Sequence, residues 1–174
     1  MSLGQMSLGQ MSLGQMKRGV GLVAAALALI LAGTADAACI EEPVVGAARL
    51  HEFEMLMMDV SLRCTRIGVA MQPHYDSMIG VHRSLFDGAA QRLQRFFATD
   101  AVADAHHRGL YDRYATMIAN RYGGGNTSLD TCRVFDAVAV EVARAGDGGR
   151  MLGAVAQAMI AHPLLEAATC PAKP

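Results

Sequence analysis

The sequence has 174 residues, of which 52% are hydrophobic, and its 15 Lys and Arg nearly balance its 16 Asp and Glu, for a formal net charge of −1. This balance leaves no large basic face that could neutralise a nucleic-acid backbone or bind an anionic membrane surface. The length suits one domain with a single hydrophobic core, once an N-terminal leader is set aside.

Residues 1–15 are three copies of Met-Ser-Leu-Gly-Gln, followed directly by Met16. A polar, glycine-bearing repeat of this length is too short to build a core, so we exclude it from the domain. Our hypothesis is that translation starts at Met16 and that the repeats are duplicated upstream sequence.

Residues 16–37 have the order of a secretory signal peptide. Two basic residues open the segment, residues 20–31 form its apolar stretch, and Ala-Asp-Ala at 35–37 supplies the small residues of a cleavage site. We predict cleavage after Ala37 and a mature domain, residues 38–174, that is periplasmic or secreted.

Two other interpretations of this leader are weaker. A transmembrane anchor needs a longer uninterrupted apolar span, and Gly33 and Thr34 interrupt this one before Asp36. A lipoprotein acylated at Cys39 would need an aliphatic residue three positions earlier, where Asp36 stands. We therefore expect no membrane span after cleavage.

All four cysteines lie in the expected mature domain, where export would place them in an oxidising compartment. An even number there predicts two disulfides, for which three pairings are possible. We favour Cys39 with Cys170, which ties the two ends, and Cys64 with Cys132, which joins two helices through the core. A metal site is a weaker interpretation because no C-x-x-C spacing occurs, and the lack of C-x-x-C-H excludes covalently attached haem.

Apolar residues of the mature domain recur at intervals of three and four, which predicts an all-α fold, a single antiparallel bundle of about five helices. The first predicted helix covers residues 47–67. The second opens with Pro73, which a first helical turn tolerates, and runs to residue 98 with His82 on its core face. The core stripe of the first helix consists of Phe53, Met57, Val60, Cys64 and Ile67.

The third predicted helix covers residues 100–122, with Thr99 or Asp100 as its N-cap and three consecutive glycines after its end. Its spacing indicates which side chains face the core. These inward-facing residues are Leu110, Tyr114, Met117 and Ile118.

The last two predicted helices are shorter. The fourth begins at Thr127 or Ser128 and ends before Gly146, and the fifth covers residues 150–162 and ends before Pro163. Their short, glycine-rich connection is typical of neighbouring antiparallel helices.

The first predicted helix also carries a second apolar stripe, formed by His51, Met55, Met58 and Leu62. We favour the interpretation that this helix is central in the bundle and that Met fills irregular space there. A partner or self-association surface is the second interpretation, and a Cu(I) site built from imidazole and thioether is the third. We expect no tight copper site, because no second His or Met cluster is aimed at this one.

Other polar residues have simpler interpretations. Asp104 and His107 stand one helical turn apart, but two ligands do not make a zinc site. His82 is expected to be a hydrogen-bonded interior side chain rather than a ligand or catalyst. A set of charged residues between the two stripes is expected to form a solvated face. These are Glu52, Asp59, Arg63 and Arg66.

The sequence holds no recognisable catalytic motif. Its serines lack a G-x-S-x-G turn, its cysteines are assigned to disulfides, and the glycine run after Tyr122 has no lysine to bind a phosphate. We therefore predict that the protein is not an enzyme and has no cofactor and no metal.

Several short motifs carry a resemblance to a known group of proteins. They are Phe53-Glu54-Met55-Leu56-Met57-Met58, Ser61-Leu62-Arg63-Cys64, His74-Tyr75-Asp76, Phe96-Phe97, Leu110-Tyr111-Asp112-Arg113-Tyr114 and Cys132. With these motifs the mature chain resembles small uncharacterised exported helical proteins of proteobacteria. The resemblance implies a helical fold and a Cys64–Cys132 bridge, and it implies no activity.

The expected function is a non-enzymatic binding module that contacts a protein or envelope component, or a second copy of itself. The alternatives are a metal or small-ligand carrier, and an immunity-type protein that neutralises a toxin. The latter rests on similarity of architecture to periplasmic immunity proteins, which are also short, helical and disulfide-bonded.

Overall fold

The computed structural model describes residues 39–99, 107–168 and 170, and these residues belong to one compact unit. The predicted repeats and leader, residues 1–37, lie outside the described residues. The described part confirms the all-α fold. Its helices are α2 (Glu42–Arg66), α3 (Gln72–Val81), α4 (Arg83–Thr99), α5 (His107–Tyr122), α6 (Leu129–Arg144), α7 (Arg150–Met159) and a 3₁₀ turn (Glu166–Ala168).

The first helix begins earlier than predicted, at Glu42 rather than residue 47. Pro43 occupies the first turn, where its missing N–H costs no hydrogen bond, and the acidic Glu42 is favoured at the positive end of the helix. Four of the five predicted core residues are buried, but Ile67 follows the end of α2 and is 45% exposed.

The second predicted helix is interrupted at His82, so the described residues form six α-helices rather than about five. His82 leaves the helical conformation, with φ −107° and ψ 18°, and its Nε2 donates to the carbonyl oxygen of Val142 at 2.9 Å. Because of this break, α3 packs against α6 and α4 packs along α2. His82 itself is buried and hydrogen-bonded, as expected.

The boundaries of the remaining helices agree with the sequence in part. Thr99 is the last residue of α4, and Asp100 lies outside the described residues. Ser128 caps α6 by accepting a hydrogen bond from the backbone N–H of Thr131 at 3.1 Å. On α5, Tyr114 and Ile118 are buried as predicted, but Leu110 and Met117 are 38% and 53% exposed. The face of α5 that packs on neighbouring helices is therefore narrower than the face over which its apolar residues are spread.

The helix α7 starts at Arg150 as predicted but ends at Met159 rather than residue 162. Arg49 on α2 donates from Nε to the carbonyl oxygen of Ile160 at 3.1 Å, and Pro163 disfavours a helical residue before it. The chain therefore leaves the helix at Ile160 and continues as an irregular segment.

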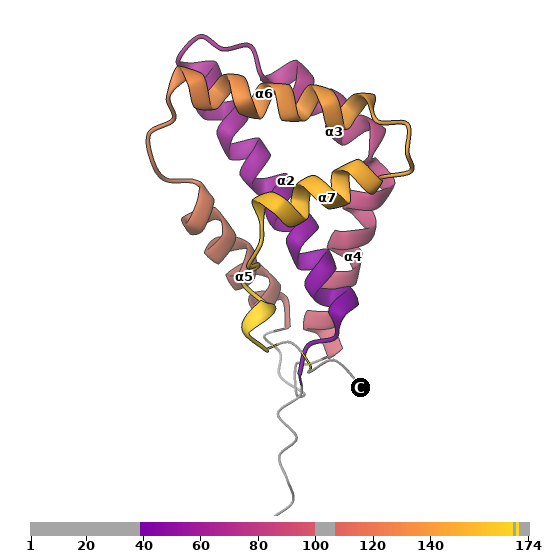
Figure 1. Ribbon diagram of the computed structural model, residues 1–174. Helices are drawn as coiled ribbons and strands as arrows, with labels where there is room; N and C mark the ends of the chain where they lie inside the picture. Colours follow the sequence, from indigo (N-terminus) through magenta and orange to yellow (C-terminus); the bar gives the residue numbers. More distant parts are fainter. Residues whose placement is uncertain (1–38, 100–106, 169, 171–174) are drawn as a thin grey trace, which may run out of the picture. The chain divides into compact units, whose positions relative to one another are not determined.

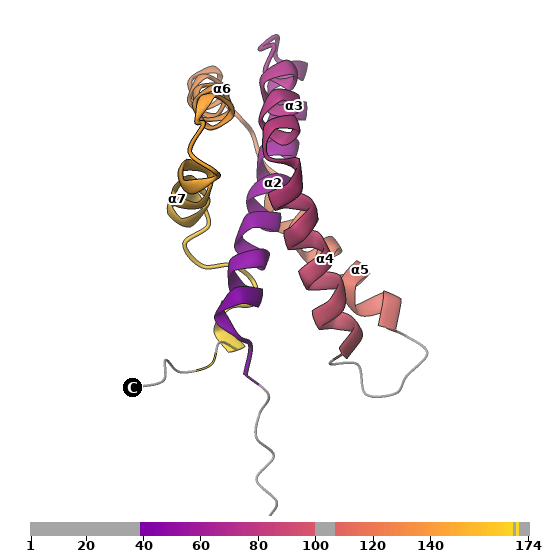
Figure 2. The same cartoon turned by 90° about the vertical axis from the view of Figure 1, so that its right-hand side faces the viewer.

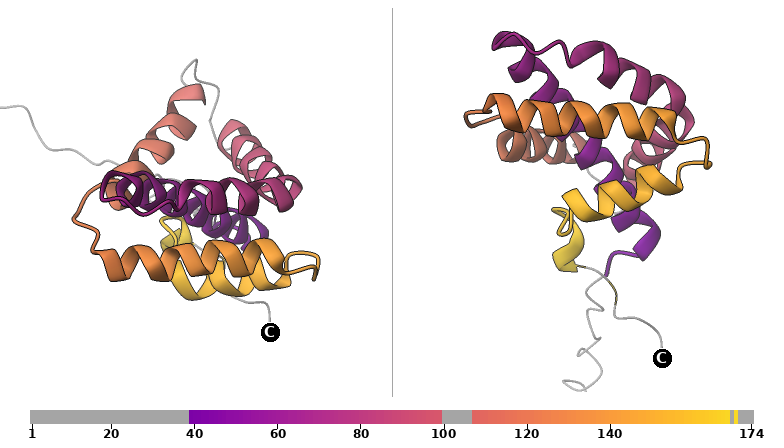
Figure 3. Two further views of the ribbon diagram at one scale, coloured as in Figure 1. Left: turned by 90° about the horizontal axis from the view of Figure 1, so that it is seen from above. Right: turned by 45° about the horizontal axis from the view of Figure 1, so that its top comes forward.

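The helix α2 is central in the unit and contacts α3, α4, α5, α6 and α7. The pair α6 and α7 lies on one side of it, and α4 and α5 lie on the other (Figure 2; Figure 3, left). The helix α4 runs antiparallel to α2, and α7 runs in the direction opposite to α6 (Figure 1). The packed pair α3 and α6 instead runs parallel, with His74 against Asp136 and His82 against Val142, so the predicted antiparallel arrangement is only partly present. Both α6 and α7 cross α2 obliquely rather than lying along it (Figure 1; Figure 3, right).

Two groups of buried side chains hold these layers together. The larger fills the space among α2, α3, α6 and α7, and includes Phe53, Met57 and Met78. The smaller lies between α2, α4 and α5, and includes Leu93, Tyr114 and Ile118. None of the helices in the described part of the chain is long and apolar enough to cross a membrane.

Two disulfides connect the pairs that the sequence analysis favoured. Cys39 is bonded to Cys170 with an S–S distance of 2.04 Å, and Cys64 to Cys132 with 2.05 Å. The first joins the two ends of the compact unit, where the N–H of Cys170 also donates to the carbonyl oxygen of Ile40. The second joins α2 to α6 inside the larger core, where both cysteines are fully buried.

Candidate functional site

The second stripe of α2 is divided between the interior and the surface. The His51 side chain is 11% exposed, and its Nε2 lies 3.4 Å from the hydroxyl of Tyr111 on α5. Met55 packs against the smaller core, and Met58 is half-buried. Leu62, at the other end of the stripe, is 50% exposed.

Aromatic rings from α4 and α5 cover the beginning of this stripe. The rings of His51 and Tyr111 stack at 6.1 Å, and Phe97 lies 5.3 Å from the ring of Tyr114 and 6.1 Å from that of Tyr111. His51 and Met55 therefore lie as expected for a helix in the centre of the bundle. Leu62 is the exposed end of the stripe.

The structure contains no assembled metal site among its described residues, where no group of three or more His, Cys, Asp or Glu side chains comes together. His51 faces Glu54 with 3.4 Å between Nδ1 and Oε2. Of the second candidate pair, Asp104 and the side chain of His107 lie outside the described residues.

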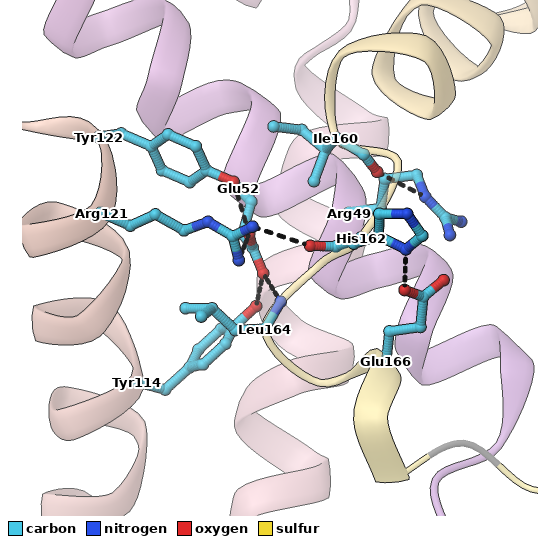
Figure 4. Close-up of polar contacts among 9 residues, drawn as sticks. All are labelled: Arg49, Glu52, Tyr114, Arg121, Tyr122, Ile160, His162, Leu164 and Glu166. Carbon is cyan, nitrogen blue, oxygen red and sulfur yellow. Dashed lines mark hydrogen bonds and ion pairs between the residues drawn. The ribbon is translucent and has the colours of Figure 1, made fainter.

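Glu52 is the main correction to the expected solvated face, because its side chain is completely buried. Its Oε2 accepts a hydrogen bond from the hydroxyl of Tyr122 at 2.8 Å. Its Oε1 accepts from the N–H of Leu164 at 2.6 Å and from the hydroxyl of Tyr114 at 3.3 Å (Figure 4). The guanidinium of Arg121 lies 3.9 Å from Oε2. We call these five residues the Glu52 network.

The Glu52 network fixes the segment that follows α7. Arg121 also donates to the carbonyl oxygen of His162 at 3.2 Å, and His162 Nδ1 donates to Glu166 at 2.6 Å (Figure 4). A buried carboxylate is tolerated only when hydrogen bonds and a positive charge compensate its lost hydration, and both are present here. The network therefore joins α2, α5 and the segment after α7, and it holds that segment against the two helices.

The tyrosines of the Glu52 network have raised pKa values. Burial raises the pKa of Tyr122 to about 12, and the hydrogen bond to Glu52 and its negative charge act in the same direction. Burial and then the Glu52 charge also raise the pKa of Tyr114. Both hydroxyls thus remain protonated donors across the neutral range.

The other charged residues of the expected face differ among themselves. Arg63 donates to the carbonyl oxygen of Tyr122 at 2.7 Å and to the hydroxyl of Thr127 at 2.9 Å, so it ties α2 to the loop after α5. Burial raises the pKa of Asp59, and the nearby charge of Arg63 lowers it. Only Arg66, at the end of α2, is exposed as expected.

A cavity of about 290 Å³, open to solvent on one side, where Gly148, Gly153 and Gln157 are exposed, lies between the first half of α2 and α7. Its walls are mainly apolar side chains and glycine backbone, with a single charged side chain. We call it the α2–α7 cavity. It is lined by Gly46, Arg49 and Leu50 of α2, Leu85 of α4, Gly148 and Gly149 before α7, and Leu152, Gly153, Ala156 and Gln157 of α7.

Comparison of the chain with models of protein families, with curated proteins and with solved structures finds no match.

The α2–α7 cavity has two distinct ends. Arg49 lies at the end of α7, where it binds the carbonyl oxygen of Ile160. At the other end, Gly149 has φ +92° and lies so close to Leu85 that a Cβ atom at Gly149 would collide with its side chain. Between these ends, a Cβ added at Gly46 or Gly153 would meet no atom within 4 Å. These two glycines therefore border open space.

The hydrophobic spacing of the sequence does not predict this cavity, and its glycines give no specific signal for it. Gly46 and Gly153 lie inside helices, where glycine is less stable than alanine by about 1 kcal/mol. No close neighbour requires their small size, since a Cβ atom would fit at both. Gly88 shares this property without lining the cavity, so helix-interior glycines alone do not mark it.

Proposed function

We propose that this protein is an exported, non-enzymatic binding domain that holds a small apolar molecule in the α2–α7 cavity. The observation that carries the proposal is the cavity itself. Its volume of about 290 Å³ corresponds to about ten water-sized groups at roughly 30 Å³ each. Small-molecule sites are concave and mostly apolar with few polar groups, as this one is.

The lining selects a compact aliphatic or aromatic ligand. Leu50, Leu85, Leu152 and Ala156 offer hydrocarbon surface, and the glycines let a ligand approach the backbone closely. A ligand of about nine non-hydrogen atoms at typical efficiencies binds with a Kd on the order of 100 µM. Octan-1-ol has this size and serves as an uncharged probe.

We expect Gly46→Leu to weaken octan-1-ol binding at least tenfold, because the leucine side chain would fill the cavity. Calorimetry on the exported form measures the affinity. Gly88→Leu is the matched control, since Gly88 is also a helix-interior glycine with no atom within 4 Å of an added Cβ, but it is exposed on α4 and does not line the cavity. Unchanged binding by Gly46→Leu, or equal loss in both variants, would contradict the proposal.

The export proposal rests on the leader and on the two disulfides, which persist in oxidising compartments. The mass of the protein recovered from the periplasm or medium tests it. We expect a chain that begins at Ala38 and contains no free thiol. A product that retains residues 16–37 in the cytoplasm would contradict export.

The alternative function is binding of a protein partner or of a second copy of the chain, and one observation favours it. Leu62 and Ile67, near the end of α2, are 50% and 45% exposed. Light scattering tests self-association: a dimer that Leu62→Glu converts to a monomer would support a second copy as the partner, and a monomer at all concentrations would exclude self-association.

A further inference from the structure

The single charged side chain in the α2–α7 cavity is Arg49, whose side chain is only 12% exposed. Its Nε donates to the carbonyl oxygen of Ile160 at 3.1 Å. Its NH1 lies 4.0 Å from Oε1 of Glu42, a side chain that is 74% exposed and accessible to water. A guanidinium has five N–H donors, so one hydrogen bond and one distant ion pair leave it capacity to bind an anion.

The opposite end of the cavity disfavours an anion. Asp147 already caps the start of α7, where its carboxylate accepts hydrogen bonds from the N–H of Gly149 at 3.2 Å and of Met151 at 2.8 Å. A second negative charge beside Gly149 would be repelled by this carboxylate. At the Arg49 end the carboxylate of Glu42 also lies near the guanidinium, but it is 4.0 Å away and 74% exposed, so a ligand carboxylate can replace it there.

We propose that the ligand of the α2–α7 cavity is a small monocarboxylate with an apolar chain, held by Arg49 at its carboxylate. This inference rests on the proposed function and names the class of its ligand. The carboxylate lies against the Arg49 guanidinium, whose planar fork matches two oxygens. The hydrocarbon chain extends along α7 toward Leu152 and Leu85. Octanoate, with about ten non-hydrogen atoms, matches the available volume.

The experiment compares octanoate with octan-1-ol by calorimetry at neutral pH on the exported form. We expect octanoate to bind at least tenfold more tightly than octan-1-ol. Arg49→Gln should abolish this preference, measured as the ratio of the octanoate and octan-1-ol affinities within the same variant. Arg66→Gln, which removes the same charge from an exposed position on the same helix, should leave both affinities unchanged. Equal affinities in the unaltered protein, or a preference that survives Arg49→Gln, would overturn the inference.

Arg49 also holds the end of α7, so the fold of each variant is checked by its circular dichroism and melting temperature. Arg49→Lys keeps the charge without the planar fork, and we expect it to retain part of the octanoate preference. If Arg49→Gln does not fold, a lysine variant that folds and has lost no preference overturns the role of the guanidinium.

The two proposals fail in different ways. Octan-1-ol binding that Gly46→Leu blocks, with no octanoate preference, would contradict the role of Arg49 and leave the proposed function standing. Binding of neither compound would contradict the proposed function itself.

Discussion

Glu52→Ala is expected to destabilise the domain by about 3 to 5 kcal/mol, because it removes the acceptor of several buried donors at once. The Tyr114 hydroxyl and the Leu164 N–H would lose their partner in a dry environment, where each unsatisfied group costs about 1 to 3 kcal/mol. Loss of the Glu52 network would also release the segment after α7 from α2 and α5. Urea denaturation of the disulfide-intact protein measures the change.

Glu141→Ala is the control for Glu52→Ala. Glu141 is 68% exposed and pairs with Arg144 across one helical turn at 3.4 Å, so its loss should change stability by less than about 0.5 kcal/mol. A loss below about 1 kcal/mol for Glu52→Ala would show that the network contributes little.

Titration of Tyr122 gives a second readout of the same variant. Its pKa of about 12 reflects burial first and then the hydrogen bond to Glu52 and the Glu52 charge, so it should fall in Glu52→Ala and remain above the ordinary value. Because the folded pKa lies above the unfolded value, this group stabilises the fold below about pH 10, and the contribution is lost as the pH rises through about 12.

Cys64→Ala together with Cys132→Ala should cost about 2 to 5 kcal/mol. The bond closes a loop with a sequence separation of 68, and removing it gives the unfolded chain more freedom. Both cysteines are also fully buried in the larger core, so the alanines leave unfilled space. Urea denaturation again measures the loss.

The other disulfide is the comparison for this pair. Cys39→Ala with Cys170→Ala opens a loop with a separation of 131, but Cys39 is exposed and leaves no core cavity. We expect this double variant to be destabilised less than the core pair. The reverse order would show that unfolded-state entropy outweighs packing in this domain.

Much of the fold could be predicted because its signals are local. Ser128 marks a helix start by its own side chain, and the apolar spacing of Phe53, Met57 and Val60 requires a helix face. The break at His82 could not be predicted. The hydrogen bond from its ring to Val142 joins residues 60 positions apart, and the local pattern on both sides favours one continuous helix.

The candidate site was harder to predict for the same reason. Glu52 looks like a solvated helix residue until residues 62 to 112 positions away, on α5 and after α7, surround it. The cavity depends on missing side chains at Gly46 and Gly153, which hydrophobic periodicity does not register. The second stripe was found, but the spacing could not show that rings of α4 and α5 cover its first half.

The most direct test of the proposed binding site is the position of a bound ligand. Nuclear Overhauser contacts between octan-1-ol and the methyl groups of the exported form locate it. We predict contacts to Leu85 and Leu152, which line the α2–α7 cavity, and their loss in Gly46→Leu. Contacts confined to Met58 and Leu62 would place the ligand on the second stripe of α2 and contradict the account.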